Sequence, residues 1–133
     1  MTTPDRPRAL IGPLLVSVGV VHVGLTPFLH GDSFRSVLEA GVIGSIEADP
    51  DQSRLRGLGF WYATAGIGTI ALGTVVTSVE RQSRTPPAGL PWVLAGIGAW
   101  GVLLMPVSPF WVFLGLAGLT VARRRRRPAT ITT

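Results

Sequence analysis

The chain contains two histidines, whose side chains can take part in more kinds of chemistry than its other residues. Both lie in or directly after the first long apolar stretch. His22 lies inside the stretch, in VGVVHVGLTPF, whereas His30 is followed by Gly31 and Asp32. An imidazole in such a place can hydrogen-bond a neighbouring helix, anchor a ligand or coordinate a metal. On one helix, residues 22 and 30 are about 12 Å apart along the axis. The two rings therefore cannot bind one ion together, a bis-histidine haem would need two chains, and His30 is predicted to be an exposed interfacial residue.

Catalytic arrangements have little support in the sequence. The apolar stretches contain no carboxylate pair, no serine–histidine–aspartate set and no cluster of metal ligands. A pairing of His30 with Asp32 lacks a nucleophile and so provides no mechanism. The absence of cysteine excludes disulfides, thiolate catalysis and cysteine metal sites. We predict no catalytic residue, no metal site and no cofactor, and we favour a protein that is not an enzyme.

The elements that position His22 are predicted from the distribution of charge. Charged residues make up 14% of the 133 residues, hydrophobic residues 47%, and the mean hydropathy is +0.44. A soluble domain carries about 25% charged residues. Four stretches contain no Asp, Glu, Lys or Arg, namely 9–29, 57–79, 89–105 and 108–122. A membrane-crossing helix needs roughly 17–25 residues, so the first two stretches are long enough and the last two are short.

These stretches predict an all-α integral membrane protein, a four-helix bundle made of two helical hairpins. Glycines in all four stretches are expected to let the helices pack closely. The remaining segments are a cytoplasmic N-terminus (1–8), an outer loop (30–56), an inner loop (80–88), a turn (106–107) and a basic tail (123–133). The first stretch is longer than the apolar core of a secretory signal, so a retained helix is predicted. A short similarity between 19–27 and 98–106 leaves a parallel pseudo-repeat of the hairpins open.

The outer loop is predicted to contain an amphipathic helix over residues 33–46. Its apolar and small side chains recur at helical spacing, at Phe34, Val37, Leu38, Gly41, Val42 and Ile46. The segment is too short to cross a bilayer and carries charge on its other face. An interfacial helix, lying on the outer leaflet or capping the bundle, fits this pattern. The residues that follow, EADPDQSRLRG, are polar and typical of turns.

The arginines predict the orientation. Nine of the twelve precede the first stretch, separate the second from the third or follow the fourth, namely Arg6, Arg8, Arg81, Arg84, Arg123, Arg124, Arg125, Arg126 and Arg127. The other three, Arg35, Arg54 and Arg56, lie in the outer loop among more numerous acidic residues. The positive-inside rule places the segments with the nine arginines, and both termini, on the cytoplasmic side of the membrane. We interpret the final arginine run as a topology anchor that contacts anionic lipid headgroups. No nucleic-acid module is present, and a homo-oligomer is left open.

A polar set is predicted near the depth of His22. Because the second membrane helix runs antiparallel to the first, Thr64 falls at that depth, with Tyr62 at the rim, and Trp100 is expected there from the third helix. Two hypotheses follow. In the first, His22 makes a structural hydrogen bond to Thr64 or a backbone carbonyl, and the protein acts non-catalytically through its helices or outer loop. In the second, these residues line a pocket for a small lipophilic molecule.

Several motifs resemble an uncharacterised family of small bacterial four-helix membrane proteins, classed as a domain of unknown function. They are GVVHVG in the first stretch, FWYATAGIGTIALG opening the second, and LLMPVSPFWVFL around residues 103–114. The most specific pieces are Phe60-Trp61 and the MPVSxFW turn, in which this chain has Pro109 where the resemblance leads us to expect glycine. The resemblance implies four membrane helices in a bacterial inner membrane and supplies no activity, so no catalytic residue is carried over.

Overall fold

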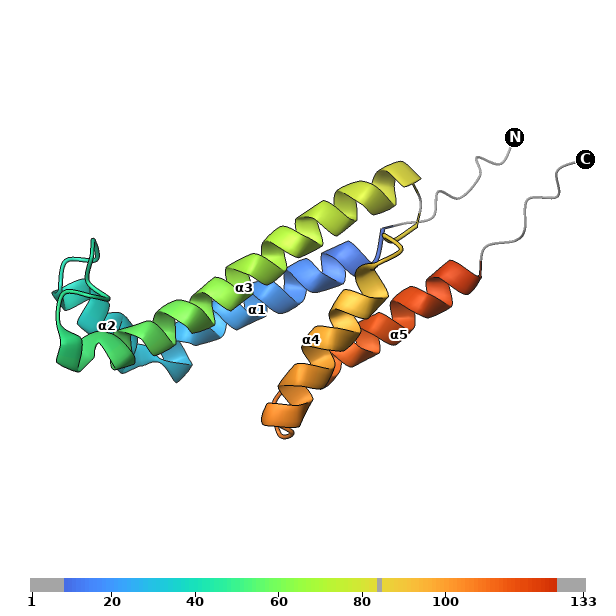
Figure 1. Ribbon diagram of the computed structural model, residues 1–133. Helices are drawn as coiled ribbons and strands as arrows, with labels where there is room; N and C mark the ends of the chain where they lie inside the picture. The colour runs from blue at the N-terminus through green and yellow to red at the C-terminus, as the bar shows by residue number, and fades with distance from the viewer. Residues whose placement is uncertain (1–8, 84, 127–133) are drawn as a thin grey trace, which may run out of the picture. The chain divides into compact units, whose positions relative to one another are not determined.

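The computed structural model describes residues 9–83 and 85–126, which form five α-helices and no strand (Figure 1). The helices are α1 (Ile11–Leu29), α2 (Gly31–Glu39), α3 (Pro50–Ser83), α4 (Leu90–Leu104) and α5 (Trp111–Arg125). The all-α prediction is confirmed. Within the described chain, residues 13–74 form one compact unit and the remainder forms a second. Segment 1–8 with Arg6 and Arg8, Arg84, and the tail from Arg127 onward lie outside the described residues.

Glycine allows the close approach of α1 and α3 in the unit 13–74. A Cβ atom on Gly19 would lie 2.6 Å from Cγ1 of Ile70 and 2.7 Å from the carbonyl oxygen of Gly66. A Cβ atom on Gly66 would lie 2.7 Å from Cγ2 of Val23. At distances this short, a side chain at either position would force its neighbours to move. Close packing through small residues therefore holds the antiparallel pair together.

The second unit contains an antiparallel hairpin of α4 and α5. A Cβ atom on Gly98 would lie 2.8 Å from Cδ2 of Leu114, and one on Gly101 would collide with the ring of Phe110. Around these contacts the hairpin buries apolar side chains, namely Leu90, Leu94, Leu116 and Ala117. The same small-residue packing therefore operates here. Other glycines, namely Gly24, Gly68, Gly96, Gly115 and Gly118, have no neighbour in the Cβ direction.

Helix α3 begins earlier than the apolar stretch 57–79, and part of the segment predicted as turn-like is helical. The carboxylate of Asp49 accepts a hydrogen bond from the backbone N–H of Asp51 at 2.9 Å. Pro50 occupies the first helical position, where its missing N–H costs nothing and its fixed φ suits a helix. An aspartate N-cap followed by proline is a strong helix start, so the polar residues after it join the helix.

Helix α2 is shorter than the predicted helix 33–46, because it ends at Glu39. The N–H of Gly41 bonds to the carbonyl of Leu38 at 3.1 Å, and the N–H of Val42 bonds to the carbonyl of Val37 at 3.1 Å. Gly41 has a φ of 83°. This pattern is a Schellman motif, in which a left-handed glycine satisfies the last carbonyls and stops the helix. The predicted helical periodicity beyond residue 40 was therefore wrong.

Helix α5 begins at Trp111, later than the apolar stretch 108–122, because residues 105–110 form a turn containing Pro106 and Pro109. At its other end α5 continues into the arginine run as far as Arg125. Cations in the last turn of a helix interact favourably with the partial negative charge of its terminal carbonyls. The basic tail is therefore partly a helix end.

Candidate functional site

Tyr62 of α3 contacts both histidines of the chain. Its ring centroid lies 3.9 Å from that of His22, with the planes 14° apart, which is a stacked arrangement. The ring of His30, the residue between α1 and α2, lies 4.8 Å from Tyr62 and is tilted by 53°. Nε2 of His22 is buried and has no hydrogen-bond partner in the described part of the chain. The three rings form an aromatic cluster where α1 meets α3.

The predicted polar set is brought together in part. His22 and Tyr62 are in contact, whereas the Thr64 hydroxyl donates to the carbonyl of Phe60 at 2.7 Å within its own helix. A helical threonine readily bonds the carbonyl four residues earlier, which explains why this hydroxyl does not serve the imidazole. Trp100 belongs to α4 in the other unit and is exposed. Among the described residues, no group of three His, Asp or Glu could hold a metal ion.

A second polar cluster, which was not predicted from the sequence, joins the outer loop to α3. Arg56 is only 8% exposed. Its Nε donates to the hydroxyl of Ser36 at 2.8 Å, and its Nη1 donates to the carbonyl of Ser45 at 2.7 Å. The hydroxyl of Ser33 donates to the carbonyl of Arg56 at 3.2 Å and accepts from the N–H of Gly59 at 3.1 Å. These bonds attach α2 and the segment after it to the start of α3.

We expect Arg56→Ala to release the outer loop. The substitution removes the donors to Ser36 and Ser45 and leaves buried acceptors unpaired, at a cost of about 1–3 kcal/mol. Limited proteolysis between α2 and α3 should therefore become faster, with global helicity by circular dichroism nearly unchanged. Arg54→Ala is the matched control, because Arg54 is exposed on the same helix and should leave the cleavage rate unaltered. Equal rates for both variants would contradict the role of Arg56.

Glu80, whose role was also not predicted from the sequence, lies at the opposite end of α3 and binds the start of α1. Its side chain is 4% exposed. The carboxylate accepts hydrogen bonds from the backbone N–H groups of Leu10, Ile11 and Gly12 at 3.1, 3.3 and 2.9 Å. The first N–H groups of a helix have no partner within it, and they carry partial positive charge. Glu80 therefore caps α1 from a neighbouring helix.

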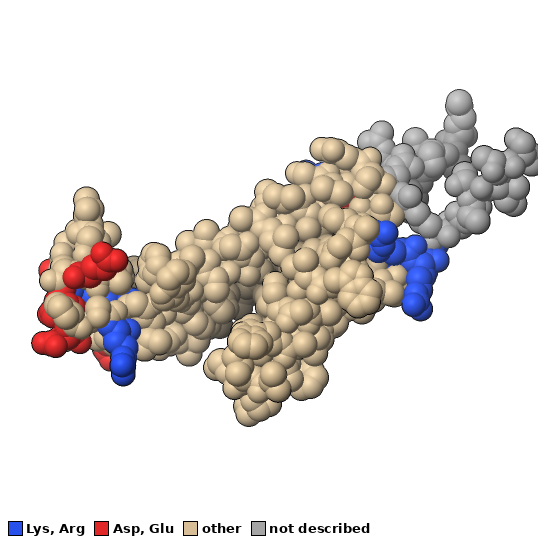
Figure 2. Space-filling model, in the orientation of Figure 1, with Lys and Arg blue, Asp and Glu red and all other residues tan. Residues whose placement is uncertain are grey.

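An arginine of the predicted topology anchor also contacts this carboxylate. Nη1 of Arg123 lies 3.9 Å from Oε1 of Glu80, so the ends of α3 and α5 meet where α1 begins. Nη1 of Arg124 donates to the carbonyl of Pro86 at 2.7 Å, and Arg125 and Arg126 are exposed. Figure 2 shows basic side chains at this end of α5, and charged side chains of both signs on α2 and the segment after it. Most of the remaining surface on that face is uncharged.

Over residues 9–83 and 85–126 these features define an all-helical protein with two helices, α1 and α3, that are long and apolar enough to cross a membrane. The chain belongs to the family of unknown function DUF6463, whose model matches residues 6–127. The predicted membership of an uncharacterised domain family is thereby confirmed. None of the curated proteins and none of the solved structures compared with the chain matches it.

Proposed function

We propose that this protein is an integral membrane protein of a bacterial inner membrane, with α1, α3, α4 and α5 as its four membrane helices. Its role is non-catalytic and is exerted through helix surfaces and the outer loop, on a partner or on a second copy. The exposure of the apolar helices carries the proposal. An apolar segment of 18 residues in α1 is only 28% buried, and the corresponding segment of α3 is only 17% buried. A core helix of a soluble protein would be mostly buried, whereas a lipid-facing helix exposes its apolar side chains.

The hydroxyl groups along α3 favour the same environment. Thr64, Thr69 and Thr74 each donate to the carbonyl four residues earlier, at 2.7, 2.8 and 2.9 Å. The hydrocarbon core contains no water to accept a hydrogen bond from a hydroxyl group, so the helix itself must supply the acceptor. Threonines that are satisfied in this way can face lipid without leaving a polar group unpaired.

Charge supports an orientation with both termini in the cytoplasm. Arg81 and the run from Arg123 lie at one end of the proposed membrane helices, and the carboxylate among them, Glu80, is engaged by Arg123. The opposite loop contains an excess of acidic residues, namely Asp32, Glu39, Glu47, Asp49 and Asp51. Arginine-rich segments remain on the cytoplasmic side of a membrane, where they also meet anionic headgroups.

Helix α2 fits the role of an interfacial helix at the outer surface. Its charged side chains, Asp32, Arg35 and Glu39, share one face by helical spacing. Phe34 and Leu38 lie on another face and are about half exposed. A short helix with charged and apolar faces lies in the membrane plane, with its charges in water and its apolar side chains among the lipids.

Two measurements on the full chain test the membrane proposal and the orientation. The protein should remain in the pellet when cell membranes are washed at alkaline pH. Because the chain contains no cysteine, single-cysteine variants report topology. An impermeant maleimide applied from the periplasmic side should label Glu47→Cys in the outer loop and spare Gln82→Cys at the end of α3. Extraction into the wash would refute an integral protein, and the reverse labelling pattern would refute the orientation.

A second candidate function, binding of a small lipophilic molecule beside His22, is favoured by the unpartnered Nε2 of that residue. An unsatisfied polar atom in an apolar segment is costly, and a ligand with one polar group could provide its partner after a small movement of the helices. Native mass spectrometry of the detergent-purified protein tests this candidate. A stoichiometric adduct should be lost in His22→Ala and kept in Val21→Ala, an exposed neighbour. A bare wild-type chain would assign His22 to packing alone.

A further inference from the structure

The turn between α4 and α5, residues 105–110, is apolar although it connects two helices at their exposed ends. Its sequence, MPVSPF, contains no charge. Val107 is 101% exposed and Met105 is 58% exposed. Turns that face water are usually built from polar residues, together with glycine and proline. An uncharged turn that presents its aliphatic side chains outward suits an apolar surrounding.

The polar groups of this turn are largely satisfied within it. The N–H and the hydroxyl of Ser108 both donate to the carbonyl of Met105, at 3.0 and 2.6 Å. The indole N–H of Trp111 donates to the carbonyl of Pro106 at 3.0 Å. Pro106 and Pro109 have no N–H to satisfy. Backbone that leaves a helix inside a bilayer must find its partners within the protein, and this turn supplies most of them.

The helices of the hairpin are also short for a full crossing. Contact between Glu80 and Arg123 places the end of α5 level with the end of α3 and the start of α1. Helix α1 has 19 residues, or about 28 Å at 1.5 Å per residue, whereas α4 and α5 have 15 each, or about 22 Å. The hydrocarbon core is about 30 Å thick, and any tilt reduces the depth that a helix reaches.

We propose that the α4–α5 hairpin enters the bilayer from the cytoplasmic side and ends inside it. Its turn, residues 105–110, contacts the acyl chains of the outer leaflet and does not reach the outer water. The inference rests on the proposed membrane location and refines it, because α1 and α3 then cross the membrane fully while α4 and α5 do not. Both ends of the hairpin remain on the cytoplasmic side, so the orientation of the termini is unchanged.

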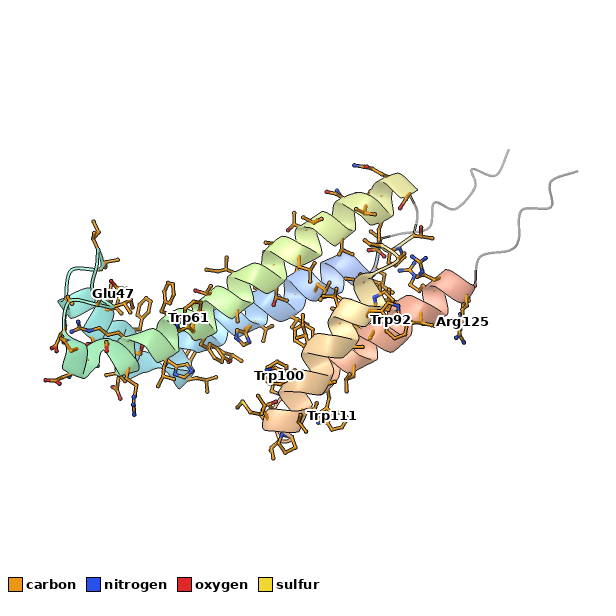
Figure 3. The ribbon with its side chains drawn as sticks, viewed as in Figure 1. Glu47, Trp61, Trp92, Trp100, Trp111 and Arg125 are labelled. Atoms are coloured by element: carbon orange, nitrogen blue, oxygen red, sulfur yellow. The ribbon has the colours of Figure 1, made fainter. Side chains whose placement is uncertain are left out.

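The tryptophans of the hairpin agree with this depth. Trp100 and Trp111 lie near the turn, and Trp92 lies towards the opposite end of α4 (Figure 3). Tryptophan is enriched at membrane interfaces because its ring is apolar while its N–H needs a hydrogen-bond partner. Since the carbonyl of Pro106 provides that partner for Trp111, its indole can lie below the headgroups without an unpaired donor.

Site-directed spin labelling tests the depth of the turn. Val107→Cys places one label at a side chain that the protein leaves uncovered, in a chain without other cysteines. The full-length variant is reconstituted into phosphatidylcholine vesicles, and collision rates with oxygen and with a water-soluble nickel chelate are measured. Glu47→Cys is the control for water, and Val21→Cys, on the exposed side of α1, is the control for lipid. The oxygen-to-nickel ratio at residue 107 should exceed that at residue 47 several-fold and approach that at residue 21.

Each other result overturns the inference in a distinguishable way. A ratio at residue 107 equal to that at residue 47, with residue 21 in lipid, would mean that the hairpin crosses fully, and the membrane proposal would stand. Low collision rates with both reagents at residue 107 would mean that protein, such as a second copy, covers the turn. Nickel access at residue 21 would refute the membrane proposal together with the inference.

Discussion

Glu80→Ala is expected to lower the free energy of unfolding by about 3 kcal/mol, a loss equal to a large part of the stability of a small protein. Three backbone N–H groups at the start of α1 lose their common acceptor, and a buried unpaired donor costs about 1–3 kcal/mol. A lost helix cap alone costs about 1 kcal/mol. The ion pair adds little because Arg123 is partly exposed.

One further variant separates charge from hydrogen bonding at residue 80, and a second variant, at an exposed glutamate, is the control. Glu80→Gln keeps an oxygen acceptor and loses the charge, so about 1 kcal/mol of destabilisation is expected, the scale of a charge at a helix N-terminus. Glu39→Ala removes an exposed carboxylate and should change stability by less than about 0.5 kcal/mol. Unfolding in detergent, followed by circular dichroism, measures all three. An alanine variant as stable as the wild type would show that Glu80 does not hold α1.

Gly19→Ala and Gly24→Ala, two substitutions on the same helix, are expected to change stability in opposite directions. At Gly19 the new Cβ would lie 2.7 Å from the carbonyl oxygen of Gly66 and 2.8 Å from the backbone nitrogen of Ile70. Backbone cannot move aside as a flexible side chain can, so α1 and α3 must separate. Overpacking of this kind costs about 1–3 kcal/mol. Gly24 has no neighbour within 4 Å in the Cβ direction, and alanine there should stabilise by about 0.5 kcal/mol.

The same unfolding measurement distinguishes this pair. Because both variants introduce one methyl group into one helix, differences in helix propensity and in detergent binding largely cancel. A helix-packing role for Gly19 requires the alanine variant at residue 19 to unfold well before the one at residue 24. Equal stabilities would mean that α1 and α3 do not approach as closely as their backbone contacts indicate.

The helical content of this protein could be predicted from its local sequence. Long uncharged stretches in a chain this poor in charge leave the backbone few alternatives to helix. The ends of those helices were also encoded locally, in Asp49-Pro50 before α3 and in Gly41 after α2. The prediction of α2 failed beyond residue 40 because apolar periodicity was followed past a glycine that stops the helix. A capping signal occupies one or two residues, whereas periodicity averages over many and is insensitive to them.

The contacts of the candidate site were decided by the tertiary structure. His22 and Tyr62 were placed at similar depths by helix direction alone, but the turn between α1 and α2 brings His30 against the same ring. In the sequence, Arg56 and Glu80 are charges in a loop and at a helix boundary. In the folded protein each is buried and hydrogen-bonds to backbone groups that are distant in sequence.

The difference has one physical origin. Hydropathy, charge runs and capping residues act over a few neighbouring residues, so the sequence by itself determined that the chain is helical, where the capping signals of α2 and α3 lie, and which segments are basic. A hydrogen bond from residues 10–12 to residue 80, or from residue 56 to residue 45, exists only after helices have packed. That packing depends on which glycine faces which backbone, and Gly19 with Gly66 is a pairing that only the folded chain selects.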